Sequence, residues 1–331
     1  MSHENEIEPL ATRLIAGQDF PANYSEFRRM FPDNDACLQY LRKLRWPDTF
    51  ICPSCGIKKE AWTQTRNRLV CSSCRHQTSI TTNTIFDKTR IPLTKWFKLA
   101  WHMTTAKFYF SATTYQQELE ISYRTVWVMM QRYRVAMSHS NRNSLTGTVE
   151  IDKVPIRETK HDKKQGHDAP ICIVAIAVEI AKSREYGRIL MRYIPDTSID
   201  NLIPFIQEMV EPGATISTVD LDIYNDLSKC GYKHKRVVLP NSSEQAYVGM
   251  SGVQSIAESF KQWIQRTYHG SFNPEHLQAY LEEFTFRFNQ GKSPDRGLAF
   301  RTLLEHSVAI GSVTDKDLTQ GYSWSSRREI S

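Results

Sequence analysis

The sequence predicts a multidomain protein that combines α+β and α/β structure. Four cysteines form two Cys-x-x-Cys pairs in the first quarter of the chain. Apolar residues then recur at helical spacing as far as a polar linker that ends at Gly147. After Gly147 the pattern changes to alternating and continuous β-branched runs separated by helices, as expected for a mixed sheet. A chain of 331 residues is long enough for two or three domains.

The charge distribution indicates a polyanionic partner. Residues 39–142 carry 17 Lys and Arg against 5 Asp and Glu, whereas residues 151–331 carry 22 against 23. Nucleic acid is the usual partner of such a basic half, and a set of solvated helix faces is the alternative. The apolar content of 40% is that of an ordinary globular protein.

The sequence gives no sign of a membrane protein or of a disulfide framework. It has no run of about 18 apolar residues, and its acidic N-terminus lacks the pattern of a signal peptide. The cysteine count of seven is odd, and four of the cysteines have metal-ligand spacing. We therefore expect a cytoplasmic, nucleoid-associated protein in a reducing environment.

Residues 20–48 are predicted to form short N-terminal helices. Pro32 interrupts the helical pattern, and Asp33 or Asn34 is expected to cap the second helix. The apolar positions at helical spacing are Phe27, Met30, Phe31, Cys37, Leu38, Leu41 and Leu44.

Residues 49–90 are predicted to form a zinc ribbon. Cys52 and Cys55 are separated by 15 residues from Cys71 and Cys74, and two such pairs suit tetrahedral S₄ coordination of a structural Zn²⁺. Free or disulfide-bonded cysteines are the alternative. Three arginines on the flanking strands are either phosphate contacts or exposed solubilising residues: Arg66, Arg68 and Arg75.

Residues 91–142 have the proportions of a helix-turn-helix DNA-binding region. An amphipathic helix over 92–108 precedes a helix that begins at Ser111 or Thr113 and ends at Leu119. After a turn at 120–122, a second helix is expected over 123–137. A generic helical hairpin is the alternative. The residues expected to face DNA are Tyr123, Arg124, Arg132 and Arg134, and those expected in the core include Val126, Met129, Met130 and Tyr133.

Residues 147–305 are predicted to form an RNase H-like mixed-sheet domain. Three strands, a helix, a strand, a further α/β step and a helix follow one another in the order of that fold. The expected strands are 148–152, 169–180, 188–195, 214–220 and 234–240, and the expected helices are 198–210, 223–232 and 252–268. Such a domain presents acidic residues of its first strand, fourth strand and last helix at one end of the sheet.

Three carboxylates are candidates for a catalytic metal site. Asp152 ends the first strand, Asp220 ends the fourth, and Glu258 lies on the last helix. Two Mg²⁺ ions about 4 Å apart, held by carboxylate oxygens, can activate a nucleophile for phosphodiester chemistry. Each acid taken singly has a structural alternative, as a turn residue or a solvated side chain. The basic loop after Asp152 suits phosphates through Lys160, Lys163 and Lys164.

The chain resembles the zinc-ribbon DDE transposases of bacterial insertion sequences, of the ISXO type that is related to Merlin elements. The resemblance covers roughly residues 25–305 and is carried by "LRWPDTFICPSCG", "VEID", "IAESF", "RTYHGSF" and "HLQAYLEEFTFRFN". It implies a catalytic domain that cleaves and joins DNA with Mg²⁺ or Mn²⁺, and N-terminal modules that bind element ends. It also implies double-stranded DNA as partner and a homo-oligomer, expected to be a dimer. The last string predicts a helix, and residues 306–331 are expected to be a polar C-terminal tail.

Three departures from the family pattern support an alternative function. Lys153 follows Asp152 where the family has Glu, Asp220 is not followed by Gly, and the residues around Glu258 differ. Asp222 is the substitute for Asp220 as second carboxylate. The alternative is a domesticated, catalytically impaired derivative that acts as a DNA-binding protein.

Overall fold

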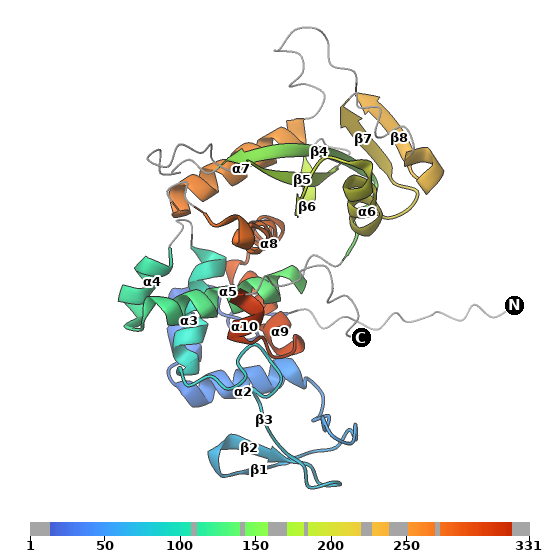
Figure 1. Ribbon diagram of the computed structural model, residues 1–331. Coiled ribbons are helices and arrows are strands. Elements are labelled where there is room, and N and C mark those ends of the chain that lie inside the picture. Colours follow the sequence, from blue (N-terminus) through green and yellow to red (C-terminus); the bar gives the residue numbers. More distant parts are fainter. Residues whose placement is uncertain are drawn as a thin grey trace, which may run out of the picture.

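The computed structural model describes residues 14–106, 111–139, 143–157, 171–181, 185–219, 227–237, 251–268 and 272–319. These residues form a small three-stranded ribbon, a helical bundle and a five-stranded sheet with helices, one after another along the molecule (Figure 1). Within these ranges, no helix is both long and apolar enough to cross a membrane.

Two short N-terminal helices, α1 (Tyr24–Met30) and α2 (Asn34–Arg45), begin at side-chain caps. The side chain of Asn23 accepts a hydrogen bond from the Glu26 amide at 3.0 Å, and Asp33 accepts one from the Ala36 amide at 2.8 Å. Each cap satisfies an amide that has no partner within its helix. The predicted cap at Asp33 is therefore confirmed.

The ribbon consists of β1 (Trp62–Gln64), β2 (Arg68–Val70) and β3 (Gln77–Ser79), paired antiparallel in the order β1-β2-β3. A short 3₁₀ turn, Thr65–Asn67, joins the first two strands, with Asn67 at φ 54°. Such short strands bury little apolar surface, so the ribbon depends on other interactions for its stability.

The helical bundle contains α3 (Leu93–Thr105), α4 (Ala112–Leu119) and α5 (Tyr123–His139). Glu120 adopts a left-handed conformation (φ 52°) at the end of α4, and α5 begins three residues later. The core residues predicted on α5 are confirmed as buried: Val126, Met129, Met130 and Tyr133. Trp96, Leu99, Ala100 and Met103 of α3 are buried as well.

The larger sheet has the order β6-β5-β4-β7-β8. Its strands are β4 (Thr148–Arg157), β5 (Ile171–Ile180), β6 (Tyr186–Ile194), β7 (Thr215–Val219) and β8 (Lys233–Val237). β4, β5 and β6 are antiparallel neighbours, whereas β7 is parallel to both β4 and β8. The predicted helix over 223–232 is, in its described part, a 3₁₀ turn at Leu227–Cys230.

Helices cover both faces of the sheet. α6 (Ile199–Met209) packs on one face through Leu202 and Phe205. α7 (Ser251–Tyr268) and α8 (Leu277–Gln290) pack on the other, where Phe260 and Trp263 are buried. The predicted helix at the "HLQAYLEEFTFRFN" stretch is thus confirmed as α8.

The C-terminal helices return to the N-terminal bundle. α9 (Arg296–Ala309) buries Phe300, Leu303 and Leu304 in the same core as α1, α2 and α3. At Gly297, an added Cβ would lie 1.7 Å from the Pro21 carbonyl oxygen, so only glycine permits this approach. The expected tail from residue 306 is corrected for its described part. α9 continues to Ala309, and Val313 and Leu318, the latter on α10 (Asp315–Thr319), are buried.

A buried ion pair joins the bundle to the sheet domain. The Arg134 guanidinium of α5 donates to Glu283 of α8 at 2.8 Å and to the Tyr268 hydroxyl at the end of α7 at 2.7 Å. The two charged side chains are 2% and 5% exposed. Arg134 also lies over the Tyr280 ring, 4.8 Å from its centroid. Burial alone would lower the pKa of Arg134. Its partners Tyr268 and Glu283 raise that pKa, so the guanidinium stays charged.

We expect Arg134→Met to lower the free energy of unfolding by about 3–5 kcal/mol, because the buried Glu283 carboxylate then keeps only the more distant Arg287, at 3.9 Å, as an ion-pair partner. Arg124→Met is the matched control, since it breaks an exposed ion pair with Asp315. It should cost less than about 1 kcal/mol. Urea denaturation followed by circular dichroism measures both, and the double variant Arg134→Met/Glu283→Leu should recover stability. If Arg134→Met and Arg124→Met lowered the free energy of unfolding equally, the buried pair would not stabilise the fold more than the exposed one.

Candidate functional site

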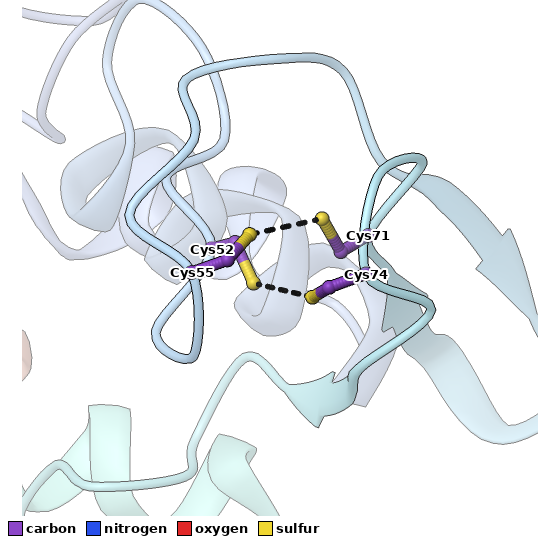
Figure 2. A group of neighbouring side chains, drawn as sticks. All are labelled: Cys52, Cys55, Cys71 and Cys74. Atoms are coloured by element: carbon purple, nitrogen blue, oxygen red, sulfur yellow. Dashed lines mark hydrogen bonds between the residues drawn. The ribbon is translucent and has the colours of Figure 1, made fainter.

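Four cysteine sulfurs gather at the base of the ribbon (Figure 2). The Sγ atoms of Cys52 and Cys74 are 3.6 Å apart, and those of Cys55 and Cys71 are 3.7 Å apart. All four lie within 4.8 Å of one another. A tetrahedral zinc with Zn–S bonds of about 2.3 Å has S–S edges of about 3.8 Å, so the cluster fits Zn²⁺.

Two loops with the same hydrogen-bond pattern hold the sulfurs. The Gly56 amide donates to the Cys52 carbonyl at 2.9 Å, and the Arg75 amide donates to the Cys71 carbonyl at 3.1 Å. Both donors are in the left-handed region, Gly56 at φ 68° and Arg75 at φ 62°. This turn after each pair brings the two sulfurs of a Cys-x-x-Cys unit to the same side.

The electrostatics of the cluster favour a thiolate at Cys71. Backbone amides of Cys74 and Ser73 lower the pKa of the Cys71 thiol to about 6, against the raising effect of burial. The thiolate is the form that binds a metal. With four protein sulfurs the coordination shell is complete, so this centre is structural rather than catalytic.

The first candidate carboxylate, Asp152, lies on the central strand β4. Its side chain is half-buried, and its Oδ1 accepts a hydrogen bond from the Lys153 amide at 2.7 Å. Burial raises the pKa of Asp152, and the amide and charge of Lys153 partly offset that effect. Its strand partner Ile176 belongs to the core beneath α7, so Asp152 faces that side of the sheet.

Glu150, two residues earlier on the same face, fixes the start of α7. Its Oε2 accepts hydrogen bonds from the amides of Gly252 at 2.9 Å and Val253 at 3.3 Å. An added Cβ on Gly252 would lie 2.7 Å from that oxygen and 3.0 Å from Ile180 Cδ1. Glycine at position 252 therefore lets α7 begin directly against the strand. The carboxylate satisfies two of the amides that a helix N-terminus leaves without partners.

The third candidate, Glu258, lies on α7, the helix that packs against β4. α7 runs alongside β4, with its start at Glu150 and its second half beside Pro155 and Ile156 (Figure 1). Glu258 is about 9 Å along α7 from Gly252, at 1.5 Å per residue. Asp152 is about 7 Å along β4 from Glu150. Glu258 is exposed and pairs with Lys261 at 3.2 Å.

Asp220 and its substitute Asp222 lie outside the described residues. β7, the parallel neighbour of β4, ends at Val219. Ile216 of β7 packs in the α6 core, on the face of the sheet opposite Asp152. The choice of Asp220 or Asp222 as the second carboxylate stays a prediction.

The candidate DNA-binding residues of α5 differ in accessibility. Tyr123 is 51% exposed at the first position of the helix. Arg124 is exposed, pairs with Asp315 at 2.6 Å and lies over the Trp127 ring. Arg132 is half-buried and donates to the Ile85 carbonyl at 3.0 Å.

The expectation for Arg134 is corrected. Its guanidinium is enclosed with Glu283 and does not reach the surface, where DNA would lie. Sequence reasoning grouped it with the exposed arginines because Arg is seldom buried, and its partner lies 149 positions away.

The ribbon exposes two of its three candidate arginines. Arg68 donates weakly to Gln77 at 3.5 Å, and Arg75 lies over the Trp62 ring, 4.8 Å from its centroid. Both side chains are exposed. The Arg66 side chain is outside the described part of the structure, as are residues Lys160, Lys163 and Lys164.

Sequence reasoning missed the role of Glu150 and Gly252. Glu150 shares the inward-facing alternation of the strand with Asp152, and a polar residue at such a position indicates a buried partner. That partner is more than one hundred residues away, so only the fold identifies it.

Comparison with known proteins gives two family matches. Residues 144–289 match the ISXO2-like transposase domain, and residues 32–77 match the transposase zinc-ribbon domain. The first match contains Asp152 and Glu258, and the second contains the four clustered cysteines. The predicted resemblance is confirmed.

One curated relative shares most of the chain. A protein of Halobacterium salinarum, described as an uncharacterized protein in transposable element ISH50, is 22% identical over 286 residues. The alignment covers 81% of this chain and 95% of that protein.

We expect Cys71→Ser to release the zinc and unfold the ribbon, because a module this small depends on its metal for folding. Zinc content measured with a chromogenic chelator, and protease sensitivity between residues 49 and 90, report the two effects. Cys230→Ser is the control, since that free cysteine lies outside the cluster. A Cys71→Ser protein that kept its zinc would contradict the assignment.

Gly252→Ala is expected to lower the free energy of unfolding by about 1–3 kcal/mol, because its Cβ forces α7 away from Glu150. Without that clash, alanine in a helix would raise the free energy of unfolding by about 0.5–1 kcal/mol. The sign of the measured change therefore shows whether the clash exists. Ser251→Ala at the exposed neighbouring position should be nearly neutral. Urea denaturation compares them, and stabilisation by Gly252→Ala would refute the close approach.

Proposed function

We propose that this chain, which joins a transposase zinc ribbon to an ISXO2-like transposase domain, is a DNA transposase with Mg²⁺-dependent cleavage and strand-transfer activity. The observation that supports it most is the pair Asp152 and Glu258. Both lie within the matched transposase domain, on a strand and a helix that run side by side. The sheet order, with three antiparallel strands followed by two parallel ones, supports an RNase H-like fold for this domain.

Asp152, Glu258 and Asp220 are the residues that would hold the metal. Carboxylate oxygens are the donors that Mg²⁺ prefers, and Mn²⁺ accepts the same set. Two bound ions supply activation of a water or 3′-hydroxyl and stabilisation of the leaving oxygen of a phosphodiester. The protein orients the carboxylates: Glu150 fixes α7 against β4, and the sheet core fixes the direction of the Asp152 side chain.

The N-terminal modules are proposed to bind the ends of the insertion sequence as double-stranded DNA. The accessible N-terminal residues of α5, Tyr123 and Arg124, are suited to contact base edges, as at the start of a recognition helix. Arg68 and Arg75 of the ribbon are suited to contact phosphates. A dimer would hold two element ends together for joining. The domesticated, non-catalytic alternative gains no support from the described residues, since Asp152 and Glu258 are both present.

Separate replacement of Asp152, Asp220 and Glu258 by Ala should lower Mg²⁺-dependent nicking by at least ~100-fold, because each removes a direct metal ligand. DNA affinity should stay near that of the unaltered protein. The substrate is a duplex that carries the terminal sequences flanking the gene, and nicks are resolved on denaturing gels. Glu211→Ala, an exposed acid of the same domain, is the control. Nicking that survives in all three variants would rule out the proposed catalytic set.

A further inference from the structure

A furrow crosses the exposed side of α7, just beyond Glu258. Two hollows lie next to each other along α7. A third hollow, of about 540 Å³, lies elsewhere, at the junction of α5 and α8. The first hollow along α7, of about 500 Å³, lies between the end of β4 and the second half of α7. The second, of about 370 Å³, lies between α7, α8 and the end of α3. Gln262 and Arg266 line both, so the two hollows are neighbours, and together they are called the furrow.

The furrow is basic. Arg157, Lys261 and Arg266 are exposed along it, and neither Asp nor Glu is among the residues that line the two hollows. In the described part of the chain, Arg157 and Arg266 have no ion-pair partner. Lys261 pairs with Glu258, and Arg287 is held by the Ala106 carbonyl at 2.7 Å. Two arginines are therefore available to an anionic ligand.

The floor of the furrow is apolar. Pro155, Ile156 and Ile264 line the hollow between β4 and α7. Apolar floor and basic rim together match a nucleic-acid backbone, which presents sugar faces beside phosphates. Lys261 and Arg266 are about 7.5 Å apart along the helix axis, at 1.5 Å per residue. One strand of DNA carries a charge every ~3.4 Å, so the basic rim spans two or three phosphates.

The position of the furrow connects the two halves of the molecule. Lys261 lies one helical turn beyond Glu258, and at the other end the furrow reaches Ala106, the residue that ends α3 of the bundle. A DNA strand in the furrow would pass from the helical bundle toward the candidate carboxylates without leaving a basic surface.

We propose that this furrow binds the sugar–phosphate backbone of DNA next to the bond that is cut, with Arg157 and Arg266 as its phosphate contacts. The location of the cut rests on the proposed function, whereas the binding itself requires no catalysis. The surface is distinct from the ribbon and α5, which carry the contacts predicted for recognition of the element ends.

The test measures DNA affinity of the full-length protein without Mg²⁺, by fluorescence anisotropy of a labelled random-sequence duplex at several salt concentrations. Arg157→Glu and Arg266→Glu are each expected to weaken binding about 5–10-fold, and each should lower the salt slope by about 1. Arg296→Glu is the matched control, because it makes the same charge change at an exposed position on α9. Its affinity and slope should change much less.

Zinc content and thermal unfolding verify that the variants fold. If the double variant Arg157→Glu/Arg266→Glu kept the affinity and slope of the control, the furrow would not be a DNA site. A change in oligomeric state by light scattering, with DNA binding intact, would instead assign the furrow to a second copy and overturn the proposal. Loss of affinity in a protein that never nicks DNA would uphold the furrow and refute only the catalytic function.

Discussion

The buried pair of Arg134 and Glu283 is the constraint on which the arrangement of the two halves depends. A charge in a water-excluded interior is tolerated only when every donor and acceptor is paired, so the three helices that supply the partners have one favourable arrangement. Those helices are α5 from the bundle and α7 and α8 from the sheet domain. The helix expected to contact DNA is therefore held in register with the domain expected to cut it. Arg134 therefore positions the helix that is proposed to contact DNA, and its own guanidinium stays buried.

α7 is fixed at both ends. Its first turn donates two amide hydrogen bonds to Glu150 of β4, and its last residue, Tyr268, accepts one from Arg134. Glu258 lies between these two attachments, and in the described part of the chain its ion pair is with Lys261 of the same helix. An exposed carboxylate with a fixed backbone can be placed accurately and still remain open to solvent and metal. Its placement is thus a property of the whole helix.

Local sequence signals predicted the elements better than the contacts between them. The Cys-x-x-Cys spacing specified the four-sulfur cluster because each pair is closed by a local turn. β4 was expected to end at Asp152 but continues to Arg157, because β5 pairs with its full length. Pro155 is tolerated there since β7 pairs only with the first three residues of the strand, so the missing amide costs no hydrogen bond on that edge.

Long-range packing explains what the sequence did not predict. The last turn of α9 was expected to belong to a polar tail. Ser307 and Val308 are nevertheless buried, because the helix is surrounded by bundle residues. A helix covered on several sides lacks the single apolar stripe that reveals an amphipathic helix. Arg134 was misassigned for a related reason, since a buried charge is recognised only when its distant partner is known.

Strand geometry also explains why Lys153 is compatible with a metal site at Asp152. Successive side chains of β4 point to opposite faces, so Glu150 and Asp152 face α7, whereas Ile151 and Lys153 face α6. The strand partner of Lys153 is Ala175, which belongs to the α6 core. The ammonium group therefore does not stand among the candidate ligands on the α7 face. Burial raises the pKa of Asp152, and the amide and the charge of Lys153 offset part of that rise, which favours the carboxylate that would bind a metal. The substitution that first favoured a non-catalytic derivative thus leaves the face of the candidate metal site unchanged.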